Sequence, residues 1–139
     1  MSYLSFRVYM KPEPQGSAKA FVIRGTNRAV VTSDNRKLRP FRSELTRMAL
    51  AELGDRPQPL FPKGEPVCVS VGFGFLKPAS VKKGRAKPCV KPDIDKLLRA
   101  VLDSLTGVAF HDDAQVVQVH ASKSYLEQDQ VTVTVREAD

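Results

Sequence analysis

Residues 91–117 read KPDIDKLLRAVLDSLTGVAFHDDAQVV, and this stretch contains the strongest structural signal in the chain. Its apolar residues recur at the i, i+3, i+4, i+7, i+8 and i+11 spacing of one helix face: Ile94, Leu97, Leu98, Val101, Leu102 and Leu105. A helix with one apolar stripe buries that stripe against another element. Gly107 then supplies the residue type that commonly ends a helix. The stretch therefore predicts an amphipathic helix packed on a core, followed by a short connection and a strand.

The segments outside this helix predict several strands. Residues 67–76 (VCVSVGFGFL) alternate large apolar residues with small ones, so that one face suits a core and the other a closely packed neighbour. Alternation also predicts a strand at residues 5–10, which ends before Pro12. Residues 115–125 and 130–135 alternate in the same way, and we expect them to form a terminal pair of strands.

Two further segments complete the order of elements. Residues 21–23 and 29–31 are short β-prone runs separated by a turn at Gly25, which predicts a hairpin. Apolar residues at helical spacing between Phe41 and Leu50 predict a second helix, which Gly54 ends. The order β-β-β-α-β-α-β-β predicts an α+β fold, a single domain over residues 1–139 in which two main helices pack on a mixed sheet.

The composition excludes several classes of protein. No apolar stretch approaches the ~20 residues that a membrane-spanning helix needs. The first ten residues lack the apolar core and the small-residue cleavage site of a signal peptide, so we expect a cytoplasmic protein. Cys68 and Cys89 form neither a disulfide framework nor a pair of zinc ligands, and we expect two unpaired thiols, one buried in a strand and one in a loop.

The chain is basic, with 22 Lys and Arg against 15 Asp and Glu and a net charge of +7. Such an excess is typical of a protein that binds a polyanion, although a merely soluble basic protein has the same balance. The distribution is more informative, because the basic residues crowd two segments that we predict to bind nucleic-acid phosphates. These candidates are Arg36, Lys37, Arg39, Arg42, Lys82, Lys83, Arg85, Lys87 and Lys91. The absence of Trp and the few Tyr argue against a stacking platform for single strands.

Asp93 and Asp95 lie where the 94–105 helix begins. In an extended segment, residues i and i+2 project to the same side, and both carboxylates would lie at the positive end of the helix dipole. Simple capping explains one such acid, but Asp112 and Asp113 add two more carboxylates beyond the helix. Clustered carboxylates repel one another unless a cation lies between them, and oxygen ligands without Cys or paired His select Mg²⁺ or Mn²⁺ over zinc. The four acids are therefore candidate metal ligands, provided that the connection before Asp112 returns toward the helix start.

Arg99 lies four residues after Asp95 and four before Asp103, on the polar face of the same helix. One interpretation is a surface ladder of ion pairs. The other is a cation that binds a phosphate and stabilises charge developing in a transition state. The spacing does not separate the two, because both need the same geometry.

Three pieces of this block stand in a fixed order. They read Asp93-Ile94-Asp95-Lys96-Leu97-Leu98-Arg99, then Asp103-Ser104-Leu105-Thr106-Gly107, then Asp112-Asp113-Ala114-Gln115-Val116. The block resembles the RusA family of Holliday junction resolvases, whose pattern is D-x-D-N-L-x-K, a D-A-L-x-G-like helix end, and D-D-x-Q-V. The order of elements around the block also agrees with that family.

The resemblance implies a small homodimeric, Mg²⁺-dependent endodeoxyribonuclease of bacteria, phages or prophages. It would resolve four-way DNA junctions by paired symmetric nicks in DNA recombination and repair, with Mn²⁺ as a substitute for Mg²⁺. Asp93, Asp95 and Asp113 match the family's catalytic, metal-binding acids, and Asp112 matches the first acid of its pair. Arg99 falls where the family has a catalytic Lys, which keeps the charge but changes the shape and the capacity for proton transfer.

Two other hypotheses stand beside this one. The first is a related Mg²⁺ nuclease that acts on other branched or flap DNA. The second is a non-catalytic basic DNA-binding protein in which the four acids serve only as helix caps and ion-pair partners.

Overall fold

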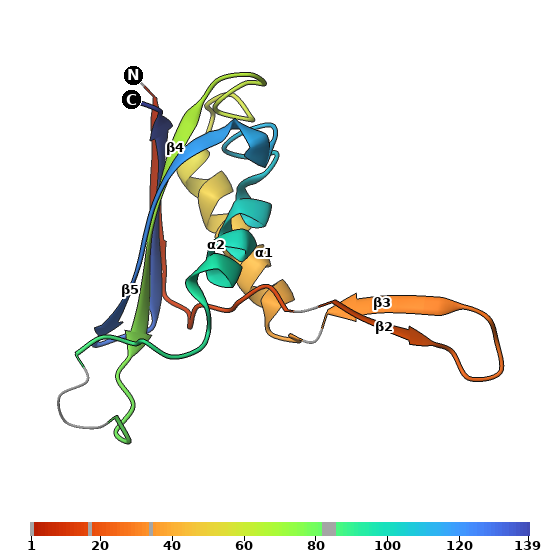
Figure 1. Cartoon of the computed structure of the whole chain (residues 1–139). Coiled ribbons are helices and arrows are strands. Elements are labelled where there is room, and N and C mark those ends of the chain that lie inside the picture. Colours follow the sequence, from red (N-terminus) through yellow and green to blue (C-terminus); the bar gives the residue numbers. More distant parts are fainter. Residues whose placement is uncertain (1, 17, 34, 82–85) are drawn as a thin grey trace.

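The computed structural model describes residues 2–16, 18–33, 35–81 and 86–139 (Figure 1). Its elements follow the chain as β1 (Tyr3–Val8), β2 (Ala18–Val22), β3 (Ala29–Ser33), α1 (Leu38–Leu53), β4 (Val67–Leu76), α2 (Ile94–Leu105), the short 3₁₀ helix η1 (Asp113–Gln115), β5 (Val116–Leu126) and β6 (Gln130–Glu137). The main sheet has the strand order β1-β6-β4-β5, and β2 pairs with β3 in a separate hairpin. β6 is antiparallel to β1 and β4, whereas β5 runs parallel to β4. This mixed sheet with two helices confirms the predicted α+β fold.

The predicted pairing of the last two strands is wrong. β4 lies between β5 and β6, with Val69 opposite Val119 on one side and Val135 on the other. A strand with neighbours on both sides can place its backbone N–H and C=O groups in two ladders, which suits the strongly apolar β4. Alternation along β5 and β6 shows which face of each strand is apolar, but it does not show which strand lies beside it.

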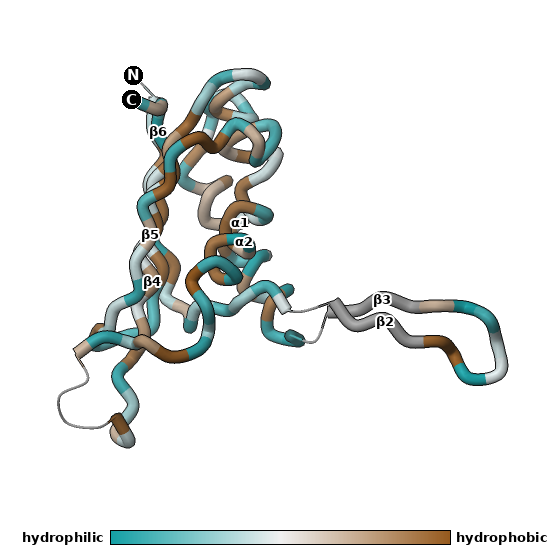
Figure 2. Tube along the Cα trace, in the orientation of Figure 1, coloured by the Kyte–Doolittle hydropathy of each residue, from teal (hydrophilic) through white to brown (hydrophobic). Residues whose placement is uncertain are grey.

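Both helices cover one face of the main sheet (Figure 1). Alternate residues of β1, β4 and β6 are buried there, and Figure 2 shows hydrophobic residues alternating with hydrophilic ones along the strands. α2 buries Leu97, Val101 and Leu105 completely, whereas Ile94 is 38% exposed. The apolar stripe predicted for α2 is therefore buried along one side only, and its N-terminal residue faces solvent.

The opposite face of β4 is closely approached by its neighbours, as its small residues predict. A Cβ added at Gly72 would lie 2.8 Å from Oγ1 of Thr132, and one added at Gly74 would collide with Leu126. The β2–β3 hairpin extends away from this packed body (Figure 1). Cys68 is buried and Cys89 is exposed, and both are unpaired as expected. Within the described residues, no helix is long and apolar enough to cross a membrane.

Candidate active site

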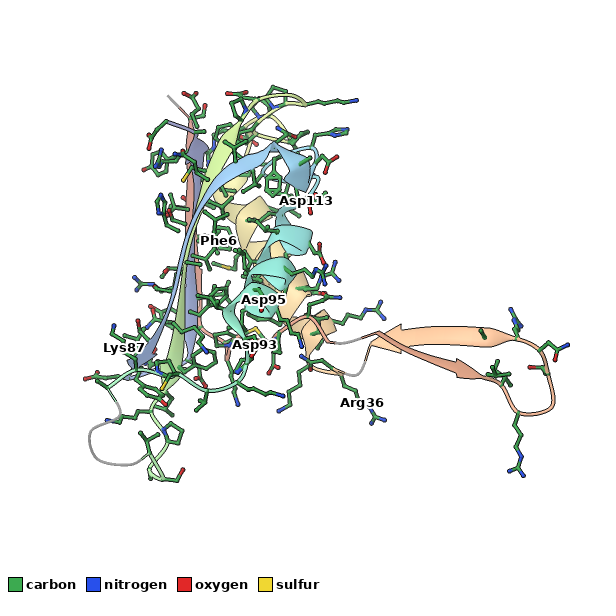
Figure 3. The ribbon with its side chains drawn as sticks, viewed as in Figure 1. Phe6, Arg36, Lys87, Asp93, Asp95 and Asp113 are labelled. Carbon is green, nitrogen blue, oxygen red and sulfur yellow. The ribbon has the colours of Figure 1, made fainter. Side chains whose placement is uncertain are left out.

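The first acid pair lies at the N-terminal end of α2 (Figure 3). Asp93 is the N-cap residue, with extended φ and ψ of −70° and 139°, and Asp95 lies in the first turn. The carbonyl of Asp93 accepts the helix bond from the N–H of Leu97 at 3.1 Å, but its side chain accepts no capping bond. Both carboxylates are exposed. The capping explanation is therefore wrong for Asp93, whose backbone starts the helix while its carboxylate stays available.

Asp93 also lines a groove of about 500 Å³ between the start of α2 and the loop after β1. Three exposed lysines line the same groove: Lys11, Lys91 and Lys96. Lysine ammonium groups bind phosphate oxygens as point charges. Glu13 adds a second carboxylate beside Asp93. Two carboxylates and three ammonium groups in one groove suit a phosphate and a cation held side by side.

Arg99 is exposed on the face of α2 next to Asp95 and Asp103. In the described part of the chain, the ion pairs are Arg47–Glu44 and Arg136–Asp139, and none involves Arg99. The ladder of ion pairs along α2 is therefore not formed. The guanidinium of Arg99 remains available to an anion outside the protein.

The second acid pair lies in η1, beyond the C-terminal end of α2. The Asp112 side chain accepts a bond from the N–H of Ala114 at 3.1 Å, and this bond, with a second from Asp113, lowers the pKa of Asp112. The pKa of Asp113 is raised, first by its hydrogen bond with Asp112, then by partial desolvation and by the negative charges of Asp112 and Asp103. Capping is thus the structural role of Asp112, and Asp113 carries the more easily protonated carboxylate.

Gln115 holds this second pair in place. Its side-chain oxygen accepts bonds from the N–H groups of His111 and Asp112, both at 2.9 Å. Its amide nitrogen donates to the carbonyls of Pro62 and Glu65, at 2.9 and 3.0 Å. The residue is only 8% exposed. These four bonds tie the acid pair to the segment before β4, and none of them involves the carboxylate of Asp112 or Asp113.

The two acid pairs do not meet within one chain. The connection after α2 turns at Gly107, whose φ is 87°, and closes with a 2.8 Å bond from its N–H to the carbonyl of Phe110. Figure 3 shows Asp93 and Asp95 near one end of α2 and Asp113 near the other. Across residues 2–16, 18–33, 35–81 and 86–139, no group of three or more His, Cys, Asp or Glu residues could hold one metal ion. The metal role of the four acids therefore stays a prediction, and a single chain does not assemble all of them.

Most of the predicted phosphate-binding residues lie at the surface around these acids. Arg36 and Lys87 lie on opposite sides of Asp93 in the view of Figure 3. Arg39 and Arg42 line a groove of about 770 Å³ beside α1, which also contains Asp103. The exposed residues Lys37 and Lys91 complete the described part of this set, and Lys82, Lys83 and Arg85 lie outside the described residues.

Lys123 on β5 has a structural role that the sequence reasoning missed. Its Nζ donates to the carbonyls of Val90 and Pro92, the segment that leads into Asp93. The signal was present in the alternation of residues 115–125, where Lys123 interrupts the row of Val119, Ala121 and Tyr125. A charge in an otherwise apolar row indicates a specific partner.

Comparisons with known proteins show the family of this chain. The sequence profile described as Endodeoxyribonuclease RusA matches residues 11–136. The chain belongs to the RusA family. The matched range includes both acid pairs and Arg99, so the RusA assignment covers the whole candidate site. The chain is also similar to Uncharacterized protein YqaN of Bacillus subtilis (strain 168), at 30% identity over 145 residues, which cover 99% of this chain and 98% of the relative. As a member of the RusA family, the chain is assigned to the endodeoxyribonucleases, which hydrolyse phosphodiester bonds within DNA.

Proposed function

We propose that this chain is a Mg²⁺-dependent, structure-specific endonuclease that resolves four-way DNA junctions by paired symmetric nicks in recombination and repair. The observation that carries the proposal is the state of the first acid pair. Asp93 and Asp95 are exposed at the positive end of α2, and in the described structure neither carboxylate serves as a cap or forms an ion pair. A protein that used these acids only for stability would engage them, so this observation disfavours the non-catalytic alternative.

The first acid pair has the chemistry of a Mg²⁺ site. Mg²⁺ keeps several waters and binds through one or two carboxylates together with substrate phosphates, so Asp93 and Asp95 fit it without a complete protein cage. Mn²⁺, which prefers the same ligands, would substitute. When bound, the ion would activate water for attack on the phosphodiester and stabilise the leaving oxygen.

The residues around the pair would bind and orient the DNA backbone. Lys11, Lys91 and Lys96 neutralise phosphate charge at the groove, since they line it beside Asp93. Arg99 presents a planar guanidinium that forms two parallel bonds with one phosphate. Arginine stays charged in proteins, so the role of Arg99 is to stabilise charge on the phosphate and not to donate a proton.

A second copy of the chain would complete the site. A two-fold axis beside the middle of α2 and perpendicular to it would set the α2 helices of two copies antiparallel, which would bring Asp113 of the partner subunit toward Asp93 and Asp95. We therefore propose a homodimer with two composite sites, each using the first acid pair of one chain and Asp113 of the other. A four-way junction has approximate two-fold symmetry, which gives each site one of two equivalent strands.

DNA recognition would depend mainly on shape. The basic residues on both sides of the first acid pair, such as Arg36 and Lys87, are suited to backbone phosphates. Contacts of this kind position a protein on DNA without reading its sequence. The arrangement of the DNA arms would therefore determine where both sites reach a strand.

The test is cleavage of synthetic DNA by the purified protein, with and without Mg²⁺. We expect paired symmetric nicks on a four-way junction, no cleavage of the matched duplex, and no cleavage without the metal. Cleavage of flaps or duplex at a comparable rate would identify a nuclease for other branched DNA. Binding without cleavage, unchanged in Asp93→Asn, would identify a non-catalytic DNA-binding protein and refute the proposal.

A further inference from the structure

Lys123 lies on the helix-facing side of β5, in a position that ordinarily takes an apolar residue. It is opposite Phe73 of β4, which is 1% exposed, and on the same side as Ala121 and Tyr125, which pack partly against the core. The lysine itself is half-buried. A charge in such a place is costly unless its hydrogen-bonding capacity is used.

The ammonium of Lys123 bonds to backbone carbonyls and to no carboxylate in the described part of the chain. Its Nζ lies 2.7 Å from the carbonyl oxygen of Val90 and 2.9 Å from that of Pro92. Hydrogen bonds from a charged donor are roughly twice as strong as those between neutral groups. The two bonds connect the central part of β5 to the loop that precedes α2.

This connection acts directly on the first acid pair. Pro92 is followed at once by Asp93, the N-cap of α2, and Asp95 lies one residue into the helix. The same helix start is also held by a 3.0 Å bond from the N–H of Gln15 to the carbonyl of Lys96. Lys123 and Gln15 therefore both hold the start of α2, and neither uses the two carboxylates.

We propose that Lys123 is a positioning residue, which sets the placement of Asp93 and Asp95 by holding the backbone at Val90 and Pro92. The proposal rests on the proposed nuclease function. A site held to within a fraction of an ångström needs residues that lock its supporting backbone. Lys123 supplies this from a rigid strand, while the acids themselves stay available to a cation.

The experiment compares Lys123→Met and Lys123→Arg with wild type. The methionine keeps the apolar stem and removes the ammonium, whereas the guanidinium can still bridge two carbonyls. Lys77→Met is the matched control, because it removes one exposed lysine near the end of β4 that has no hydrogen bond to residues 90–92 in the described structure. If Lys123→Met does not fold, Lys123→Gln takes its place.

The first readout is amide hydrogen exchange in the metal-free protein. We expect faster exchange in Lys123→Met at residues 88–97, unchanged exchange in α1, and recovery in Lys123→Arg. The second readout is junction cleavage against Mg²⁺ concentration. Replacing a group that orients metal ligands costs roughly 10- to 100-fold in activity or metal affinity, so the half-saturating Mg²⁺ concentration should rise by about that factor, again with recovery in Lys123→Arg. Junction affinity without metal should equal that of Lys77→Met.

Two results would overturn the inference. One is wild-type exchange at residues 88–97 together with a wild-type Mg²⁺ requirement in Lys123→Met. The other is equally faster exchange in α1, which would show that Lys123 only stabilises the fold as a whole. If the wild-type protein cleaves no DNA, the proposed function fails, and the exchange experiment still decides whether Lys123 holds this loop.

Discussion

A pair of aspartates lies at each end of α2, but the two pairs differ in whether their carboxylates are hydrogen-bonded. At the N-terminal end, Asp93 and Asp95 are exposed, and in the described structure neither side chain has a capping bond or an ion pair. At the C-terminal end, Asp112 caps η1 and shares a hydrogen bond with Asp113. A carboxylate that already accepts backbone bonds is part of the structure, whereas one without them can accept a ligand.

The residues that hold the backbone next to each acid pair, Gln115 and Lys123, also differ. Gln115 is a buried neutral amide, and its bonds join the second pair to the segment before β4. Lys123 is a half-buried cation that, among the described residues, bonds to the backbone before the first pair. In both cases the anchor holds the main chain and does not touch the Asp113 or Asp93 carboxylate. Backbone anchoring therefore leaves each of these acids a side chain that a neighbouring molecule can use.

The largest effect should come from placing substitutions at the two ends of α2 in different chains of one dimer. Asp95→Asn and Asp113→Asn should each lose more than the roughly 100-fold typical of replacing a group that only supports a ligand. Coexpressed with different tags and purified as a heterodimer, the two variants should regain one nick per junction, because one composite site then contains every native acid. Denaturing gels of strand-labelled junctions measure this.

The matched control for that experiment is the heterodimer of Asp95→Asn with Asp93→Asn. Both changes lie at the same end of α2, so every composite site lacks an acid, and no cleavage should return. A verified Asp95→Asn/Asp113→Asn heterodimer that stays inactive would show that Asp113 is not shared between chains.

A smaller effect should follow from removing the anchor of the second pair. Gln115→Ala removes the side-chain partner of the N–H groups of His111 and Asp112 and of the Pro62 and Glu65 carbonyls, which are partly buried. A buried group left without a partner costs about 1–3 kcal/mol. With some of these groups reaching water, we expect a loss of about 2–4 kcal/mol in the free energy of unfolding, measured by urea denaturation. Gln118→Ala, which removes one bond to the N–H of Asp139, should cost about 1 kcal/mol or less. Equal losses in the two variants would contradict the role assigned to Gln115.

The smallest effect should be a change in the titration of the second pair. The pKa of Asp113 is raised first by its hydrogen bond with Asp112, then by partial desolvation and by the Asp112 charge. Asp112→Asn keeps the cap but removes the charge, so the pKa of Asp113 should fall toward its ordinary value, as measured by carboxyl NMR. Asp103→Asn should lower it less, because Asp103 is a weaker cause.

The sign of the accompanying stability change follows from linkage. A carboxyl group whose pKa is raised by folding contributes stability below its unfolded pKa and loses it as the pH rises through the folded pKa. Asp113 therefore favours the folded protein in acid relative to neutral pH, and this contribution should shrink in Asp112→Asn. Asp112 has the opposite sign, since its lowered pKa contributes stability above its unfolded pKa that is lost as the pH falls. An unchanged Asp113 titration in Asp112→Asn would contradict the pairing of the two acids.

The sequence by itself determined the elements that depend on local spacing. The apolar period of residues 94–105 predicted α2, the alternation of residues 67–76 predicted β4, and the order of elements predicted an α+β fold, all confirmed by the structure. The three motif pieces within residues 93–116 indicated the family, because they lie close together in the chain and keep their order. These signals are local because helix and strand periods repeat every few residues.

Only the tertiary structure decided what these elements contact. It placed β4 between β5 and β6, separated the acid pairs to the two ends of α2, and brought Lys123 to the loop before Asp93. It also distinguished Asp112, which caps a helix, from Asp93, which does not. Each of these outcomes depends on the pairing of segments far apart in the chain or on the direction of a side chain. The hydrophobic periodicity of the sequence indicates neither of these. The physical reason is that a strand satisfies its backbone equally well beside several neighbours, and packing of the whole core selects one of them.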